Sequence, residues 1–106
     1  TTGAILQTVY IDNATNMDWE DITVDSNYIY MGNFGNNNGD RTDLQILKIA
    51  KANITSAATI HLTAQIINFS YSDQTSFASS STNNYRRTNH HFIIIYFLFC
   101  KFSIAC

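Results

Sequence analysis

The chain lacks several features that mark common classes of protein. Its 106 residues contain no proline, four glycines, two cysteines and one tryptophan, and only 13% of them are charged. The six basic residues are scattered, whereas a nucleic-acid-binding surface gathers Lys and Arg on one face. The apolar run Phe92 to Phe99 is less than half of the ~20 residues that a membrane-spanning helix needs. We therefore expect no nucleic-acid partner and no membrane span.

Patterns for zinc and for common catalytic sites are also missing. His61 stands alone on an apolar segment, and His90 and His91 are adjacent, so their rings would face opposite sides of a strand. Cys100 and Cys106 lie at no ligand spacing from these histidines. The sequence shows no nucleophile elbow, no phosphate-binding loop and no signal peptide. We expect no cofactor other than a calcium ion, which is discussed below.

The chain does contain a succession of β-type segments separated by turn residues. Low charge with abundant Asn, Ser, Thr and Tyr suits a β-rich extracellular protein. Apolar and β-branched residues predict strands over residues 4–11, 21–24, 28–32, 43–50 and 60–71. Asp25-Ser26-Asn27 predicts a hairpin turn between the second and third strands. Residues 32–40, with three glycines and four asparagines, predict a long loop.

The most informative stretch is Asp18-Trp19-Glu20-Asp21-Ile22, which is followed by the hairpin and then by Gly35-Asn36-Asn37-Asn38-Gly39-Asp40-Arg41. It resembles the blades of a group of secreted bacterial β-propeller proteins, mostly of unknown function. Those blades carry Trp-Glu-Asp-Ile before the hairpin and Gly-Asn-Asn-x-Gly-x-Arg after it. The resemblance covers approximately residues 5–83. It implies an all-β fold of antiparallel strands and an extracellular or cell-surface location.

The implied propeller is incomplete in this chain. A blade takes about 40 to 50 residues and a propeller needs at least about four blades, so the chain holds one to two. Neighbouring blades are therefore needed to complete the fold. The resemblance also favours strand over helix for residues 43–51, which fit both patterns. Within residues 60–71 the alternation slips at Ile66-Ile67, which predicts a β-bulge there.

Two functions agree with this resemblance. The first is a binding or scaffolding role in a secreted or cell-surface propeller, with an unknown ligand or protein partner and no catalysis by this fragment. The alternative is a fragment of a phytase-like or esterase-like propeller hydrolase, whose acids gather calcium at the mouth of the central channel. A second acidic cluster from a neighbouring blade would distinguish them, and the sequence has none after Asn84.

The candidate site residues belong to the same motif. Trp19, Glu20, Asp21 and Arg41 are the expected ligand-binding residues, and Asp18, Glu20 and Asp21 are the expected oxygen ligands of a metal. The structural alternative has the acids holding backbone amides at a turn and Trp19 packing in the core. In that alternative Arg41 pairs with Glu20 or Asp21 and holds the loop on the hairpin.

The loop itself is a poor calcium site by sequence. With Gly39 at the sixth position of a calcium loop, Phe34 occupies the first position and Gln45 the twelfth, and neither supplies a carboxylate.

Residues 85–106 break the pattern. The chain is expected to divide into a partial propeller at residues 1–84 and an atypical apolar tail at 85–106. AT-rich codons give a small set of residue types in any reading frame, and this tail is rich in them: Ile, Phe, Tyr, Asn and Lys. Our hypothesis is that the tail is out of frame, because the resemblance stops abruptly where the apolar density rises. Translating the parent nucleotide sequence in the other two frames tests this hypothesis. If neither frame continues the propeller pattern, the hypothesis is wrong.

Overall fold

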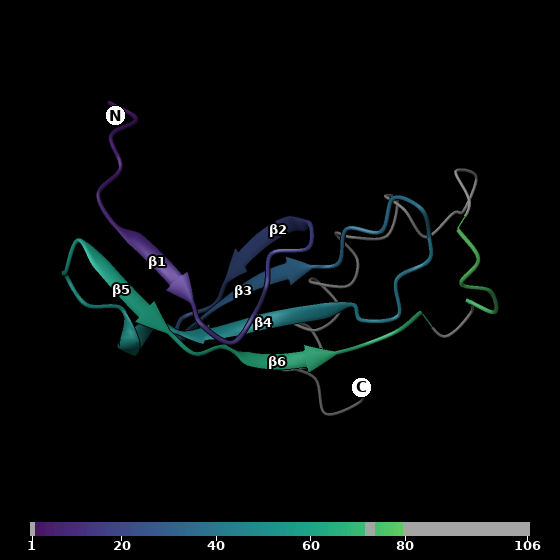
Figure 1. The fold of residues 1–106 in the computed structure, drawn as a ribbon. Helices are drawn as coiled ribbons and strands as arrows, with labels where there is room; N and C mark the ends of the chain where they lie inside the picture. Colours follow the sequence, from purple (N-terminus) through teal and green to yellow (C-terminus); the bar gives the residue numbers. More distant parts are fainter. Residues whose placement is uncertain (1, 72–73, 80–106) are drawn as a thin grey trace.

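The computed structural model of the chain describes residues 2–71 and 74–79. These residues form an all-β fold with six strands and one 3-10 turn (Figure 1). The elements are β1 (Thr8–Ile11), β2 (Trp19–Val24), β3 (Tyr28–Asn33), β4 (Gln45–Ala50), η1 (Lys51–Asn53), β5 (Thr59–Leu62) and β6 (Gln65–Asn68). The expected all-β class is confirmed, and so is the assignment of residues 43–50 to a strand rather than a helix.

The main sheet has four antiparallel strands in the order β2-β3-β4-β6. The expected hairpin joins β2 to β3. Asp25 makes the turn, because its Oδ1 accepts the backbone N–H groups of Asn27 at 2.8 Å and Tyr28 at 2.7 Å. The side chain thus supplies the local hydrogen bonds that let the chain reverse. Strands β2 and β6 lie at the two edges of this sheet.

The chain leaves this sheet after β4 and returns to it at β6. Between them β5 pairs in parallel with β1, and the two form a separate two-stranded sheet. The predicted single strand over residues 60–71 is therefore wrong: it is two strands in two sheets, separated by Thr63 and Ala64.

The side chain of Asn13, distant in sequence, binds the backbone of Ala64 between the two strands. Asn13 Nδ2 donates to the carbonyl of Ala64 at 2.8 Å, and Asn13 Oδ1 accepts the N–H of the same residue at 2.9 Å. The predicted bulge at Ile66-Ile67 is wrong, because β6 pairs with β4 in regular register. The slip in the alternation arises because Ile66 and Ile67 pack on apolar clusters at opposite faces of the sheet, so β6 is apolar on both faces. The register shift that the structure does contain lies in β2, between Trp19 and Asp21.

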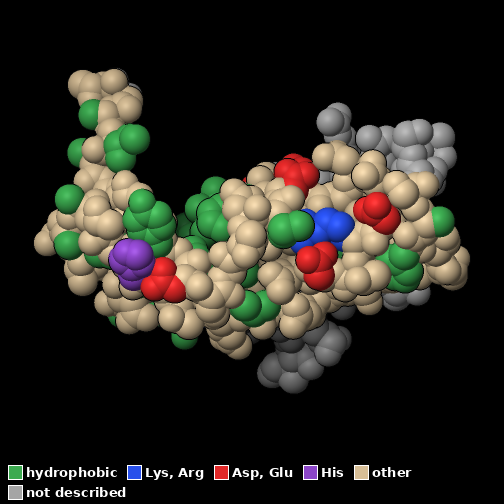
Figure 2. All heavy atoms as spheres, in the orientation of Figure 1, with side chains coloured by type: hydrophobic (Ala, Val, Ile, Leu, Met, Phe, Trp, Pro, Cys, Tyr) green, Lys and Arg blue, Asp and Glu red, His purple; other side chains and the backbone are tan. Residues whose placement is uncertain are grey.

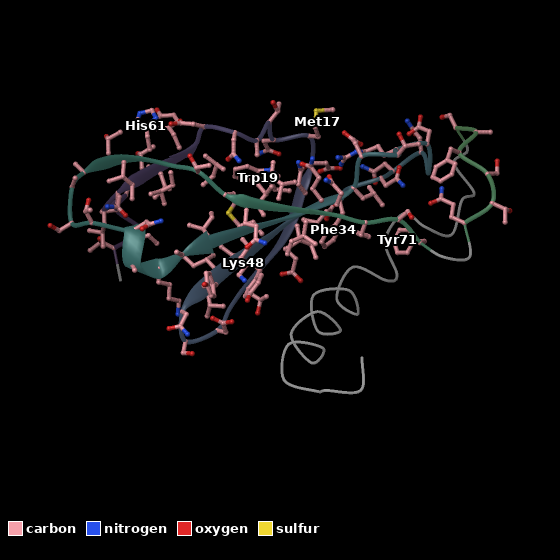
Figure 3. The ribbon with its side chains drawn as sticks, turned by 90° about the horizontal axis from the view of Figure 1, so that it is seen from below. Met17, Trp19, Phe34, Lys48, His61 and Tyr71 are labelled. Atoms are coloured by element: carbon pink, nitrogen blue, oxygen red, sulfur yellow. The ribbon has the colours of Figure 1, made fainter. Side chains whose placement is uncertain are left out.

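Both faces of the main sheet are apolar, as predicted for β4. Ile46 faces a group that we call the aromatic core, and its neighbour Leu47 faces a group that we call the aliphatic core. The buried members of the aromatic core are Tyr30, Phe34, Leu44 and Ile46, and those of the aliphatic core are Leu47, Ile49, Ile60, Leu62 and Ala64. Figure 3 shows Phe34 and Trp19, which pack on the two different cores. Burial of each Leu, Ile or Phe side chain in these cores stabilises the folded chain by about 1.5 to 3 kcal/mol.

Within the described residues, no helix combines the length and the hydropathy that a membrane crossing requires. The predicted apolar tail at residues 85–106, and with it the hypothesis of an out-of-frame product, lies outside the described residues.

Candidate functional site

The candidate site is built on the bulge in edge strand β2. Trp19 pairs with Asn33 and Asp21 pairs with Gly32, so Glu20 is the extra residue of the bulge. The bulge resets the alternation, and Trp19 and Ile22 therefore share one face although they are three residues apart. The sequence pattern did not reveal this, because a strict period of two places them on opposite faces.

Two hollows adjoin Trp19. The first, which we call the outer hollow, has a volume of about 330 Å³ and is lined by Trp19, Glu20, Asp21, Ile22 and Met31. The second, which we call the apolar cleft, has a volume of about 170 Å³ and lies between the main sheet and the β1/β5 pair. Its lining side chains are uncharged and, apart from the indole N–H of Trp19, apolar; they are Val9, Ile11, Trp19, Ile22, Ile29, Met31, Ile49, Ile54 and Leu62. Three of the five expected ligand or metal residues thus share the outer hollow.

The acids of the motif have separate local tasks. Asp21 Oδ1 accepts the backbone N–H of Ile22 at 2.8 Å, while Glu20 is exposed on the edge of the sheet. Asp18 faces the loop instead: its backbone carbonyl accepts the Gly35 N–H at 3.0 Å, and its Oδ2 accepts a hydrogen bond from Asn37 Nδ2 at 3.2 Å. The structural alternative expected these acids to hold backbone amides at a turn, whereas the amide that Asp21 bonds lies within strand β2.

Arg41 belongs to the loop and does not line either hollow. Its Nη1 donates to the carbonyl of Gly35 at 2.7 Å, its Nη2 to the carbonyl of Asn33 at 3.4 Å, and its Nε to Asp43 Oδ1 at 2.9 Å. The predicted pairing of Arg41 with Glu20 or Asp21 is wrong, because Asp43 is only two residues away and closes the ion pair within the loop. Figure 2 shows acidic side chains around a basic one at this end of the molecule.

The Arg41 guanidinium, chiefly through its hydrogen bond, lowers the pKa of the Asp43 carboxyl below its ordinary value. The carboxylate is therefore charged at neutral pH and pairs with the arginine that spans the loop.

Asp18, Glu20 and Asp21 do not converge on one point where they could bind a metal ion together. Among residues 2–71 and 74–79, no three His, Cys, Asp or Glu side chains are grouped so that they could hold a metal ion together. Asp18 points to the loop, whereas Glu20 and Asp21 line the outer hollow. A calcium ion held by Asp18, Glu20 and Asp21 stays a prediction.

Two buried side-chain amides, those of Asn33 and Asn36, position the motif. Asn33 is 2% exposed, and its side chain accepts the N–H of Met17 at 3.3 Å and donates to the carbonyl of Thr15 at 3.1 Å. It thereby fixes the segment that leads into β2. Asn36 is 1% exposed and accepts the Arg41 N–H at 3.1 Å. In sequence these asparagines look like ordinary turn formers, so their burial had no visible signal.

A second polar cluster joins β1 to β5. His61 Nδ1 lies 2.8 Å from Asp12 Oδ1, and the Tyr10 ring stacks on the imidazole with 4.9 Å between ring centroids. His61 appeared isolated in the sequence because its carboxylate partner lies 49 residues away. Both side chains of the pair are more than half exposed, and the pair links β5 to the residue that follows β1.

The chain matches none of the protein-family models, curated proteins or solved structures with which it was compared. The resemblance to secreted β-propeller blades stays a prediction carried by the residues quoted for it.

Proposed function

We propose that this chain is a binding or scaffolding unit of an extracellular or cell-surface β-propeller and that its four-stranded sheet is one blade. The observation that carries the proposal is the antiparallel order β2-β3-β4-β6 combined with apolar side chains on both faces. A propeller blade is a four-stranded sheet of this kind, and its neighbours cover its faces. Ile22 is 62% and Val24 54% exposed on β2, which leaves apolar area for such a neighbour.

The outer hollow is the proposed ligand contact. Glu20 and Asp21 bring negative charge to its rim, and Trp19 brings an aromatic ring, while Ile22 and Met31 make the remainder of the lining apolar. This combination suits the cationic end of a Lys or Arg side chain on a partner protein, because the ring face and the carboxylates both attract a cation. Arg41 contributes indirectly, by holding the loop that contacts Asp18.

A fluorescence titration tests this binding role, because Trp19 is the only tryptophan of the chain. We expect a Lys-rich peptide to change its emission saturably and a Glu-rich peptide of equal length to have no effect. Glu20→Gln together with Asp21→Asn should weaken binding about fivefold to thirtyfold, which corresponds to about 1 to 2 kcal/mol.

Asp40→Asn is the matched control, since Asp40 is an exposed acid outside both hollows. An equal loss of binding in the control would show that the peptide responds only to overall charge, and the proposed contact would be wrong.

The same protein tests the hydrolase alternative when calcium replaces the peptide. A micromolar heat signal in calorimetry that is lost on either substitution, Glu20→Gln or Asp21→Asn, would favour a calcium-dependent propeller hydrolase over the binding role.

A further inference from the structure

The first residues of the chain form an apolar arm. Residues 2–7 leave the body of the molecule ahead of β1, and Ile5 and Leu6 on this arm are 86% and 91% exposed (Figure 1). The base of the arm is fixed, because Gln7 Nε2 donates to the carbonyls of Thr55 at 2.8 Å and Ala57 at 2.6 Å. Gln7 thus anchors the base of the arm, and the large apolar side chains of Ile5 and Leu6 lie beyond it, outside both cores.

The apolar cleft matches the arm in character, and none of residues 2–71 and 74–79 fills it. Its volume of about 170 Å³ is close to that of a dry cavity that takes up a benzene-sized group. The branched four-carbon side chain of Ile or Leu is smaller than benzene and carries no polar atom. The cleft has no charged lining residue, so it selects an apolar occupant. Figure 2 shows hydrophobic side chains both on the arm and in the hollow beside it.

The arm does not enter the cleft of its own chain. Val9 on the wall of the cleft follows Leu6 by only three residues, and the intervening Thr8 is held by a 2.9 Å hydrogen bond from its N–H to the carbonyl of Ala58. The arm therefore continues outward from the base that fixes it, as Figure 1 shows. An arm of this kind can fill the cleft only of another molecule.

The rim of the cleft favours side-chain insertion over strand pairing. Ile22 lies on edge strand β2, and its backbone N–H is already bonded to Asp21 Oδ1 at 2.8 Å. An incoming strand would have to displace that bond to pair with β2 at this position. Apolar side chains that enter from above the sheet face meet no such competition.

We propose that the apolar arm of one copy of the chain inserts Ile5 or Leu6 into the apolar cleft of a second copy. The arm and the cleft are different surfaces, so two copies that exchange arms form a closed two-fold dimer, and copies that do not exchange arms form a ring or an open chain. The inference goes beyond the proposed binding role and does not depend on it, because the arm, not the outer hollow, makes the contact.

Complementary variants test the assembly. Ile5→Asp with Leu6→Asp removes the apolar arm and leaves the cleft intact, while Ile22→Glu obstructs the cleft and leaves the arm intact. Sedimentation velocity should show concentration-dependent association of the unaltered chain and a monomer for each variant alone. An equimolar mixture of the two variants should give a one-to-one dimer, because one intact arm meets one intact cleft. Both variants add negative charge, so attraction between the altered residues does not account for this dimer.

Met17→Asp is the matched control. Met17 is 57% exposed and belongs to neither the arm nor the cleft, so the added charge should leave association unchanged. Near-UV circular dichroism verifies that each variant is folded, which the exposure of the altered side chains favours.

A peptide provides a second measurement that does not depend on the Ile22→Glu variant. A synthetic peptide with the sequence of residues 2–8 should shift the Trp19 emission of the arm variant, and the same peptide with Asp at the positions of Ile5 and Leu6 should not. The proposal is wrong if the unaltered chain stays monomeric, if the arm variant associates like the unaltered chain, or if the mixed variants do not dimerise. Association lost only through Ile22→Glu would assign the cleft to another occupant.

Discussion

The loop end of the molecule and the cleft end differ in how their side chains are satisfied. In the loop that follows β3, Phe34 is 0% exposed and Asn36 is 1% exposed, and Arg41 donates to three different residues. At the cleft end Ile22 and Val24 remain more than half exposed. The loop is held by many polar contacts, whereas the cleft end leaves apolar area exposed. If the proposed assembly holds, the contacts that stabilise the fold and those that bind a second copy lie in different regions.

The difference has a physical origin. Part of the loop is closed by hydrogen bonds between residues five to eight positions apart, and Asp18 and Gln74 add hydrogen bonds to it from outside. Apolar burial depends on area and has no direction, so covering β2 requires another layer of structure. We expect substitutions in the loop to change folding stability and substitutions in the cleft to change association.

Arg41→Ala should produce the largest loss of stability. The substitution leaves the Gly35 carbonyl without its donor and removes the ion pair with Asp43, and the Arg41 side chain is only 14% exposed. We expect the free energy of unfolding to fall by about 2 to 4 kcal/mol. Urea denaturation followed by Trp19 emission measures it. Arg41→Lys keeps the charge but not the planar guanidinium, so its free energy of unfolding should lie between those of the unaltered chain and Arg41→Ala. A loss under about 0.5 kcal/mol would show that the loop is held by other contacts.

Gly35→Ala should have the next largest effect. A Cβ at this position would collide with the side chain of Asp18, so the substitution should cost about 1 to 3 kcal/mol. The same substitution in an Asp18→Gly background should cost less, because the colliding atoms are gone. Equal costs in both backgrounds, measured in a double-mutant cycle by urea denaturation, would contradict the proposed close contact.

Asp43→Asn should have a smaller, pH-dependent effect. Asp43 has a lowered pKa in the folded state, so its ion pair contributes stability above the unfolded value of 3.8 and loses it as the pH falls through the folded pKa. Its side chain is 58% exposed, so we expect less than about 1 kcal/mol at neutral pH. The difference between the unaltered chain and Asp43→Asn, measured by urea denaturation, should shrink in acid. A difference that grows in acid would have the wrong sign for this pair.

Ile22→Glu should have the smallest effect on folding, although it obstructs the cleft. Ile22 is 62% exposed, so we expect the free energy of unfolding to change by no more than about 0.5 kcal/mol. Thermal denaturation at a concentration where the chain is monomeric separates this effect from association. A loss as large as that of Arg41→Ala would remove the contrast between the two ends of the molecule.

Part of the fold was predictable because it depends on neighbours in the sequence. Alternating β-branched residues predicted the strands, and Asp25 predicted the hairpin because its side chain bonds amides two and three residues on. The pairing of β1 with β5 was not predictable, since Val9 meets Ile60 across 50 intervening residues. The division of residues 60–71 into two strands likewise depends on Asn13, which contacts Ala64 from a distance of 51 residues.

The candidate site follows the same rule. The sequence by itself determined that Trp19 and Glu20 directly precede a strand that contains Asp21, and that a glycine- and asparagine-rich loop ends before Arg41. Only the tertiary structure decided that a bulge turns Trp19 to the face of Ile22, and that Arg41 bonds within its own loop. Strand propensity and turn chemistry act over a few residues and can be read along the chain. The direction of a side chain depends on strand register and on which apolar surfaces meet, and folding alone brings these together.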